Sequence, residues 1–344
     1  MNTFTSNLLV WYQSNRRQLP WRKTKDPYAI WLSEVIMQQT RVAQGTPYFE
    51  RFLSRYPTVN DLAHAKEDDV LKLWQGLGYY SRARNLHKAA KEVSFHLDGI
   101  FPSSYNTLLK LPGVGAYTAS AIASICFDEC TAVVDGNVYR VLARYFDIDT
   151  PINQSKGPRL FQELAQALID PHNPGEYNQA IMEFGALQCT PKQPLCTTCP
   201  VAGTCQSSQN NSIAERPQKI KAKPAKKRFF HYLIPFDKNN NTLLIKREGK
   251  GIWKGLNEFP LIEADSLLDE EQLKAHPNAP SWSKTAKWTL FEEDAVIHKL
   301  SHQTLYTHFW ILEDIPESFP LPWNAVKDYG VPRLIERFLQ KFSR

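Results

Sequence analysis

The stretch LPGVGAYTASAIAS, residues 111–124, joins a glycine turn directly to an apolar helix. Gly113 and Gly115 flank Val114, and small or apolar residues then recur with helical spacing at 119, 122, 123 and 126. Glycines at such a place let the backbone turn tightly and bring N–H groups against a phosphate, helped by the helix N-terminus. The stretch alone leaves an ordinary turn between two helices as the alternative.

Helical periodicity continues on both sides of this turn. Apolar residues follow the i, i+3, i+4, i+7 pattern over 70–77 and 86–93, and a similar stripe covers 160–168. Prolines and glycines separate these segments, at 57, 76–78, 102, 112–115 and 171–175. The pattern predicts an all-α domain over residues 1–205.

A second helix start carries an acid. In AVVDGNVYRVLARY, residues 132–145, Asp135 stands at the beginning of a helical pattern, twenty residues after Gly115. Its side chain can face the groove beside the glycine turn. Taken by itself, Asp135 is best explained as a helix N-cap.

Charge and composition limit the function classes. Residues 1–228 hold 27 Lys and Arg against 19 Asp and Glu (+8), whereas residues 229–344 hold 14 against 16 (−2). A modestly basic first part is compatible with a polyanionic partner but does not establish one. The N-terminus lacks the pattern of a signal peptide, and no apolar run approaches 18 residues, so no membrane association is expected.

Four of the six cysteines are crowded into one segment. Cys189, Cys196, Cys199 and Cys205 form the pattern C-x6-C-x2-C-x5-C. Four thiolates at this spacing predict a metal site, and a tetrahedral sulfur set suits zinc or an iron–sulfur cluster. A structural zinc ribbon would usually show two C-x2-C pairs. The spacing therefore favours a cluster over zinc without excluding zinc.

The chain changes character after the cysteines. Residues 206–228, QSSQNNSIAERPQKIKAKPAKKR, have the composition of a basic linker, which serves as a tether and could also touch phosphates. Beyond it, the segments 229–236, 242–247 and 304–312 are rich in β-branched and aromatic residues and are predicted as strands. Apolar residues at 334, 335, 338 and 339 predict a closing helix. Residues 229–344 are thus expected to form a separate α/β domain.

The cysteine spacing, the LPGVG turn and the acid that follows resemble the endonuclease III superfamily of DNA repair glycosylases, over roughly residues 25–205. The resemblance implies a 4Fe–4S cluster on the four cysteines. It also implies a helix-hairpin-helix that grips the DNA backbone beside an extruded nucleotide, because a glycosidic bond cannot be reached inside the duplex. Asp135 would stabilise the oxocarbenium ion left on the sugar. The hairpin contacts would come from Leu111, Gly113, Val114 and Gly115.

Two positions place the chain within this superfamily. Endonuclease III-like enzymes attack the sugar with a lysine just after the hairpin, where this chain has Tyr117. The segment WLSEVIMQQTRV, residues 31–42, resembles the MutY-type branch that excises adenine. There Glu34 is the implied general acid, with a raised pKa that lets it protonate the adenine ring, and deprotonated Glu34 would later activate water. Tyr117 and Asn137 would support the two carboxylates by hydrogen bonds. Without the resemblance, Glu34 is a helix carboxylate among apolar neighbours.

The same resemblance implies further contacts with the base and the DNA. For Gln38, Gln39 and Tyr79, which would enter the base stack, packing in the core or on the surface is the alternative, and it is the preferred explanation for Gln38. These residues are Trp21, Arg22, Gln38, Gln39, Tyr79 and Gln179.

The C-terminal domain resembles the Nudix-like domain of the MutY-type family, in GIWKGLNEFP (251–260) and KLSHQTLYTHFW (299–310). The metal-binding box of true Nudix hydrolases is missing after Gly255, so the domain is expected to recognise rather than hydrolyse. The family inspects 8-oxoguanine with a Phe-Ser-His loop. Ser301 and His302 match it, whereas Leu300 replaces the aromatic residue.

The sequence predicts a monofunctional adenine glycosylase that acts on double-stranded DNA with A:8-oxoguanine or A:G mispairs. It is expected to be a monomer in the bacterial cytosol, associated with the nucleoid. Two other readings stay open. One is an endonuclease III-like glycosylase and lyase for damaged pyrimidines, which Tyr117 disfavours. The other is a non-catalytic DNA-binding or redox-sensing protein that keeps the cluster for structure alone.

Overall fold

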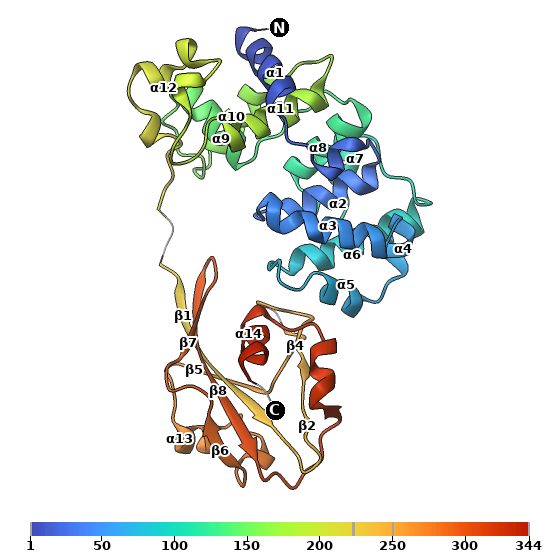
Figure 1. Ribbon diagram of the computed structural model, residues 1–344, viewed down its shortest axis with the longest axis vertical. Coiled ribbons are helices and arrows are strands. Elements are labelled where there is room, and N and C mark those ends of the chain that lie inside the picture. The colour runs from blue at the N-terminus through green and yellow to red at the C-terminus, as the bar shows by residue number, and fades with distance from the viewer. Residues whose placement is uncertain (1, 222–223, 250, 343–344) are drawn as a thin grey trace. The chain divides into compact units, whose positions relative to one another are not determined.

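The computed structural model describes residues 2–221, 224–249 and 251–342, and its contacts divide the chain into two compact units (Figure 1). The first unit combines Met1–His64 with Asn85–Lys221, and the second combines Ala65–Arg84 with Ala222–Arg344. The second unit thus takes a segment from the middle of the predicted helical region.

The first unit is helical over its described residues, which confirms the predicted fold class. Helix α6 begins in the second unit and continues into this one. The helices are α1 (Thr3–Asn15), α2 (Pro27–Met37), α3 (Val42–Arg55), α4 (Val59–His64), α6 (Ser81–His96), α7 (Tyr105–Leu108), α8 (Ala116–Phe127), α9 (Gly136–Tyr145), α10 (Gly157–Leu168), α11 (Pro174–Leu187) and α12 (Gln206–Gln209).

Helices α2 and α8 form the centre of this unit. Residues 28–36 of α2 and 118–125 of α8 are buried on all sides, and the two helices pack against each other. The sequence pattern indicated an apolar stripe on α8, but the structure buries the whole helix because α2, α7 and α11 contact it. Only small side chains, mostly Ala and Ser, allow such close packing on several sides.

The turn between α7 and α8 is a helix-hairpin-helix. The backbone N–H of Val114 donates to the carbonyl of Leu111 at 3.1 Å, and Gly113 has a φ of +76°. A Cβ at Gly113 would lie 2.5 Å from the Cβ of Asn85. The turn therefore requires glycine at 113, both for its left-handed backbone and for the space.

Helix α11 packs against both α9 and α1. A Cβ at Gly185 would lie 2.6 Å from the Cβ of Asn137, so the absence of a side chain there allows the two helices to meet closely. This close approach brings the beginning of α9, with Asp135 as its N-cap, alongside α11.

The predicted linker is ordered over its first half. Residues Gln206–Gln209 form α12 and Ile213–Glu215 form a 3₁₀ turn. Arg216 then pairs with Asp147 at 2.9 Å, and the backbone N–H of Ile152 donates to the carbonyl of Gln218 at 3.0 Å. Polar composition alone did not indicate these contacts with the first unit.

The second unit contains a mixed sheet in the order β5-β1-β8-β6, with β7 also paired to β8. Its long strands β1 and β8 run parallel, and the other pairs are antiparallel. The strands are β1 (Lys226–Pro235), β5 (Leu261–Ala264), β6 (Lys287–Leu290), β7 (Val296–Lys299) and β8 (Gln303–Glu313).

Short elements complete this unit. The predicted strand 242–247 is broken into two short pieces, β2 and β3, which pair with different partners. The short elements of the second unit are α5 (Glu67–Leu73), β2 (Asn241–Thr242), β3 (Ile245–Lys246), β4 (Asn257–Glu258), α13 (Glu270–Ala275), β9 (Leu321–Pro322) and α14 (Arg333–Lys341).

Alternating side chains of β1 divide between two apolar clusters. Phe230 and Tyr232 belong to one cluster and Leu233 to the other, as the period of a strand requires. Helix α14 covers the first cluster, where the rings of Phe309 and Phe338 stack at 4.4 Å. The closing helix predicted from the sequence is therefore present.

We expect Gly113→Ala to lower the free energy of unfolding by about 2–3 kcal/mol, because the new Cβ meets both a left-handed backbone and the Asn85 side chain. Gly115→Ala is the matched control, since its φ is −93° and nothing lies within 4 Å of the added Cβ. The control should stay within about 1 kcal/mol of the wild type in urea unfolding. Equal losses in both variants would contradict this account of the hairpin.

Candidate active site

Glu34 is a buried carboxyl in the middle of α2, with a residue exposure of 9%. The hydroxyl of Tyr117, on α8, donates to its Oε2 at 2.6 Å. Burial raises the pKa of Glu34 to about 7, and nearby Asp135 raises it further, while the Tyr117 hydrogen bond and Arg22 act in the opposite direction. A carboxyl in this state carries a proton for a large part of the time at neutral pH.

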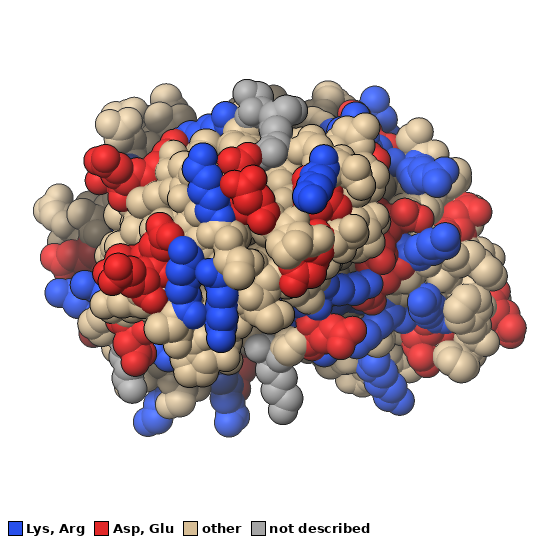
Figure 2. Space-filling view, turned by 90° about the horizontal axis from the view of Figure 1, so that it is seen from below, with Lys and Arg blue, Asp and Glu red and all other residues tan. Residues whose placement is uncertain are grey.

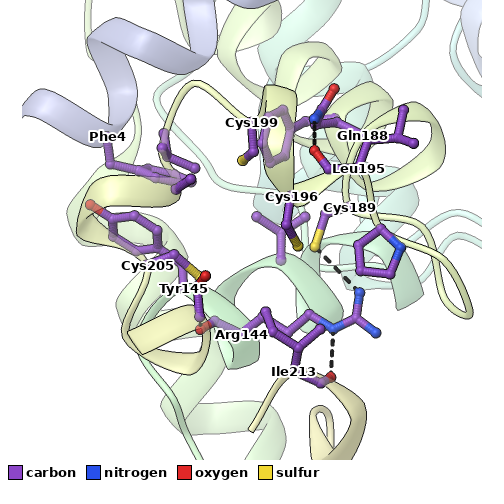
Figure 3. Close-up of a pocket in the computed structure, with 16 residues that line it drawn as sticks. Phe4, Arg144, Tyr145, Gln188, Cys189, Leu195, Cys196, Cys199, Cys205 and Ile213 are labelled. Carbon is purple, nitrogen blue, oxygen red and sulfur yellow. Dashed lines mark hydrogen bonds between the residues drawn. The ribbon is translucent and has the colours of Figure 1, made fainter. Parts of the chain in front are cut away.

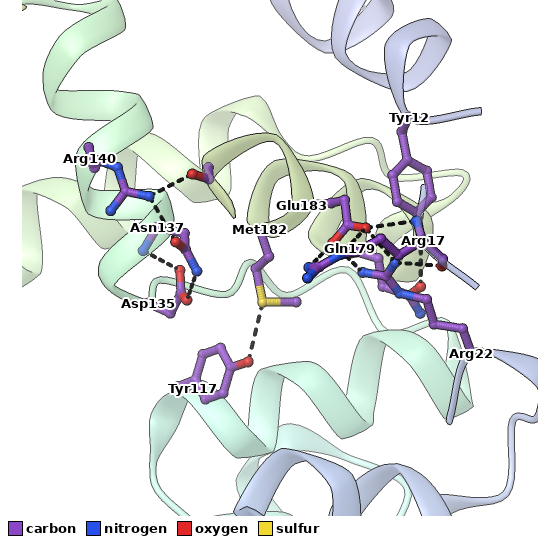
Figure 4. A network of polar contacts seen from close by, with 11 residues as sticks. Tyr12, Arg17, Arg22, Tyr117, Asp135, Asn137, Arg140, Gln179, Met182 and Glu183 are labelled. Atoms are coloured by element: carbon purple, nitrogen blue, oxygen red, sulfur yellow. Dashed lines mark hydrogen bonds and ion pairs between the residues drawn. The ribbon is translucent and has the colours of Figure 1, made fainter. Parts of the chain in front are cut away.

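The hydroxyl of Tyr117 contacts two groups. Besides Glu34, it lies 3.2 Å from the sulfur of Met182, on α11 (Figure 4). Burial and the neighbouring carboxylates hold the pKa of Tyr117 well above its ordinary value, so the phenol keeps its proton and acts as a donor.

Asp135 is held by the first turn of α9. Its Oδ1 accepts from the backbone N–H groups of Asn137 and Val138, and its Oδ2 accepts from the Asn137 side chain, each at 2.8 Å. Arg140 in turn donates to Oδ1 of Asn137 at 2.9 Å. Burial raises the pKa of Asp135, whereas these hydrogen bonds lower it. Asp135 is thus the N-cap that the sequence indicated, and its orientation is fixed.

The other residues predicted around the base lie on α11 and on the 3₁₀ turn before α2. Trp21 is buried and packs edge-on against Phe49 at 5.3 Å, so it contributes to the core. Arg22 binds the carboxylate of Glu183 through both terminal nitrogens, at 2.9 and 3.0 Å. Oε1 of Gln179 accepts from the hydroxyl of Tyr12 at 2.9 Å, which leaves the amide Nε2 as its donor.

The hairpin residues divide by exposure. Leu111 and Val114 are buried, whereas Gly113 and Gly115 are exposed. The turn therefore presents backbone to solvent while its apolar side chains anchor it. An exposed N–H at the start of α8 is the kind of group that a phosphate oxygen accepts from.

Two residues predicted to contact DNA have a left-handed backbone. Gln39 has a φ of +54° and is exposed, while Gln38 beside it is half-buried and donates to Thr118 at 3.2 Å. Tyr79 has a φ of +46° and is 51% exposed. Such backbone conformations are uncommon for residues with a side chain and often occur at binding sites.

Tyr79, Ser301 and His302 line one groove of the second unit, with a volume of about 590 Å³. The hydroxyl groups of Tyr79 and Ser301 lie 2.6 Å apart. Ser301 and His302 are exposed between β7 and β8, and Leu300 beside them packs against the apolar cluster under α14. Leu300 therefore anchors this loop to the apolar cluster.

The four cysteines line one cavity (Figure 3). Arg144 of α9 closes one side, with Nη1 at 3.5 Å from the sulfur of Cys189 and Nη2 at 2.9 Å from the carbonyl of Pro191. Across the part of the chain that the structure describes, no three His, Cys, Asp or Glu side chains are placed to hold a single metal ion. The thiols surround a space rather than converge on a point.

Sequence reasoning missed Tyr12, Arg17, Met182 and Glu183. A signal for two of them was present, because Gln179, Met182 and Glu183 have the i, i+3, i+4 spacing of one helix face. Figure 4 shows these side chains on the same side of α11. Tyr12 and Arg17 are more than 160 positions away from their partners, and no local pattern pointed to them.

Comparison with known proteins identifies the families of both parts of the chain. Residues 32–167 match the model of the HhH-GPD superfamily base excision DNA repair proteins, and residues 231–341 match a NUDIX domain. An adenine DNA glycosylase of Buchnera aphidicola subsp. Baizongia pistaciae is 36% identical over 312 residues, which cover 90% of this chain and 86% of the relative. The chain belongs to the adenine DNA glycosylase family.

Other members of the family and related structures extend the match. The adenine DNA glycosylase of Rattus norvegicus is 35% identical, over 100% of this chain and 78% of its own. A structure of a thermostable thymine-DNA glycosylase superposes with a TM-score of 0.56 at 29% identity, over 60% of this chain and 95% of that one. An endonuclease III–DNA complex, with a TM-score of 0.53 and 21% identity over 60% and 94% of the two chains, shares the fold.

The chain is therefore a glycosylase enzyme with a helix-hairpin-helix domain and a Nudix-like C-terminal domain. None of the helices in the described residues has both the length and the apolar character that a membrane crossing needs.

We expect the stability of the protein to report the titration of Glu34. Its folded pKa of about 7 exceeds the ordinary 4.5, so the neutral carboxyl contributes stability that is complete below about pH 4.5 and lost as the pH rises through 7. The free energy of unfolding of the wild type, minus that of Glu34→Gln, should fall by about 3 kcal/mol between pH 4.5 and 8. A difference that stays constant across this range would mean that Glu34 titrates normally.

Proposed function

We propose that the enzyme hydrolyses the bond between adenine and deoxyribose in double-stranded DNA, where adenine is mispaired with 8-oxoguanine or guanine. The observation that carries the proposal is the buried carboxyl of Glu34, with its hydrogen bond from Tyr117 and a pKa that burial and the charge of Asp135 raise. Adenine leaves poorly unless it is protonated, and a carboxylic acid that is neutral near pH 7 can supply that proton.

The two carboxyl groups have different tasks in this mechanism. Glu34 protonates the imidazole-side ring nitrogen of a flipped adenine, and the glycosidic bond breaks. Asp135, fixed by three hydrogen bonds from its own helix, offers negative charge to the oxocarbenium ion. Deprotonated Glu34 then takes a proton from the attacking water. Asn137 and Tyr117 hold the two carboxyl groups throughout.

The position of Tyr117 supports hydrolysis without strand cleavage. A lyase of the endonuclease III type needs an amine after the hairpin to form a Schiff base with the sugar. Here the phenol stands in that place, and its hydroxyl is engaged by Glu34 and Met182. We therefore infer a monofunctional glycosylase.

The groove that contains Tyr79, Ser301 and His302 is the proposed site for the base opposite adenine. The Ser301 hydroxyl and the His302 ring are exposed polar groups on one loop, and Leu300 anchors that loop. An exposed tyrosine next to them offers a ring that can stack on a base. These groups suit recognition of 8-oxoguanine by hydrogen bonds and stacking.

Double-stranded DNA is the proposed partner. The exposed backbone at Gly113 and Gly115, the exposed Gln39 and the half-buried Gln38 are available for contacts with the strand. Arg22 and Gln179 are the residues that we expect to contact the base. The face of the molecule drawn in Figure 2 carries Lys and Arg interspersed with Asp and Glu, so positive charge is not gathered there. We infer that the protein works as a monomer in the bacterial cytosol, at the nucleoid.

A 4Fe–4S cluster is the proposed cofactor. Cys189, Cys196, Cys199 and Cys205 would hold it, since their thiols line one cavity that the side chain of Arg144 closes. Iron–sulfur clusters take four cysteine thiolates in this way. When bound, the cluster would cross-link the loop that carries exposed Lys192, whose positive charge suits a contact with phosphate.

The function is tested with duplexes that carry a single A opposite 8-oxoguanine, G, C or T. We expect base loss that becomes a strand break only after alkali, fastest opposite 8-oxoguanine. Glu34→Gln should lower the single-turnover rate by about 100-fold or more. Ser301→Ala should lower the preference for 8-oxoguanine over G by about tenfold, because one hydrogen bond is lost. Breaks without alkali would indicate a lyase, and no base loss from any duplex would refute the proposal.

The cofactor is tested by metal analysis of the purified protein. We expect brown protein with about four iron atoms per chain, and loss of the iron in Cys199→Ser. Cys130→Ser is the matched control, since Cys130 is exposed and lies outside the cavity. Colourless protein with about one zinc per chain would overturn the cluster in favour of zinc.

A further inference from the structure

Arg82 is a half-buried cation in the first turn of α6 that the proposed mechanism does not use. The N-terminus of a helix is its positive end, so a cation in the first turn is unfavourable there. Burial lowers the pKa of Arg82 to about 10, which still leaves the guanidinium charged at neutral pH. Neither the helix nor its burial thus explains a positive charge at this position.

The polar contacts of Arg82 are with the turn that leads into Tyr79. Its Nη2 donates to the carbonyls of Leu77 and Gly78, at 3.4 Å each. The indole Nε1 of Trp74 donates to the same Gly78 carbonyl at 3.0 Å, and the backbone N–H of Arg82 donates to the carbonyl of Tyr79 at 2.8 Å. The three successive carbonyls 77, 78 and 79 therefore all accept from Trp74 or Arg82.

The same guanidinium contacts two aromatic rings of this turn. Its central carbon lies over the ring of Trp74, 5.1 Å from the ring centre, and over the ring of Tyr79, 5.7 Å from the ring centre. A cation over an aromatic face is attracted by the negative charge of that face. Arg82 thus restrains both the backbone before Tyr79 and the ring of Tyr79 itself.

Tyr79 needs such a restraint. Its φ of +46° is a left-handed conformation that a residue with a side chain rarely adopts, and it follows two glycines with positive φ, Gly76 at +100° and Gly78 at +72°. The side chain is 51% exposed, so core packing alone does not hold it. A strained, exposed residue keeps one conformation only where its neighbours fix it, and Arg82 is one of those neighbours.

The position of Tyr79 matters because it forms one wall of the groove proposed for the base opposite adenine. Its hydroxyl lies 2.6 Å from that of Ser301, and both residues line this groove together with His302. 8-Oxoguanine differs from guanine only by an oxygen on C8 and a hydrogen on N7. A site that separates two such similar bases needs its contact groups in place before the base arrives.

We propose that Arg82 is a positioning residue for lesion recognition, which holds Tyr79 against the Ser301 loop so that the groove prefers 8-oxoguanine to guanine. This inference rests on the proposed function of the groove. Arg82 acts through Tyr79 and contacts no base itself.

The test is equilibrium binding of duplexes that carry a tetrahydrofuran abasic analogue opposite 8-oxoguanine or guanine, since these ligands cannot be cleaved. We expect Arg82→Met to weaken binding of the 8-oxoguanine duplex about tenfold and of the guanine duplex much less. Arg82→Lys keeps a cation without the planar fork and should lose about threefold. In Tyr79→Ala, adding Arg82→Met should not change the preference further, because the residue through which it acts is gone.

The control is Lys91→Met, which removes an exposed cation from the opposite side of the same helix, nine positions further on. It should leave the preference unchanged. An equal loss for both duplexes in Arg82→Met would show a structural role only and overturn the proposal. So would a further loss of preference when Tyr79 is already Ala. If Arg82→Met does not fold, Arg82→Lys decides, because a wild-type preference in that variant contradicts the role of the guanidinium.

Hydrogen exchange without DNA separates this inference from the proposed function. The amides of Leu77 and Arg82 are donors within the turn, to the carbonyls of Trp74 and Tyr79. We expect them to exchange about tenfold faster in Arg82→Met, with α8 unchanged. Exchange at the wild-type rate would refute the positioning role. If the wild type itself shows no preference between the duplexes, the proposed function of the groove fails, and the exchange result alone decides whether Arg82 holds Tyr79.

Discussion

The burial of the Glu34 carboxyl is the constraint on which the rest of the site depends. A charged carboxylate in an apolar interior is costly, so burial favours the neutral acid and raises its pKa. Tyr117 satisfies one oxygen with a hydrogen bond at 2.6 Å, which limits that rise without reversing it. The packing of α2 against α8 thus raises the pKa of Glu34 and also places the Tyr117 hydroxyl that donates to it. A positive charge brought closer to Glu34 would favour the ionised carboxylate and lower its pKa.

Helix α9 links the site to the cysteine loop. Helix α9 begins at the residue that follows Asp135. Two arginines further along this helix bind the cysteine loop. Arg140 donates to the carbonyl of Cys189 at 2.8 Å, and Arg144 donates to the carbonyl of Thr190 at 2.7 Å. A loop fixed by a cluster would therefore also stabilise the helix that orients Asp135.

Much of this architecture could be predicted from the sequence, for local reasons. The helices follow from periodicity, the hairpin from its glycines, and the N-cap role of Asp135 from its place before a helix. The network around Glu183 could not be predicted, because Arg17 and Arg22 meet it from more than 160 positions away. The grouping of residues 65–84 with the C-terminal unit was likewise missed, since it depends on tertiary contacts.

The most direct test of the account is the pKa of Glu34 itself. It can be measured by ¹³C NMR of carboxyl-labelled glutamate, with Glu34→Gln used to assign the signal. The account predicts a signal that titrates near pH 7, at least two units above an ordinary glutamate. A signal that titrates near 4.5 would contradict the account, because Glu34 would then be ionised at neutral pH and unable to protonate adenine.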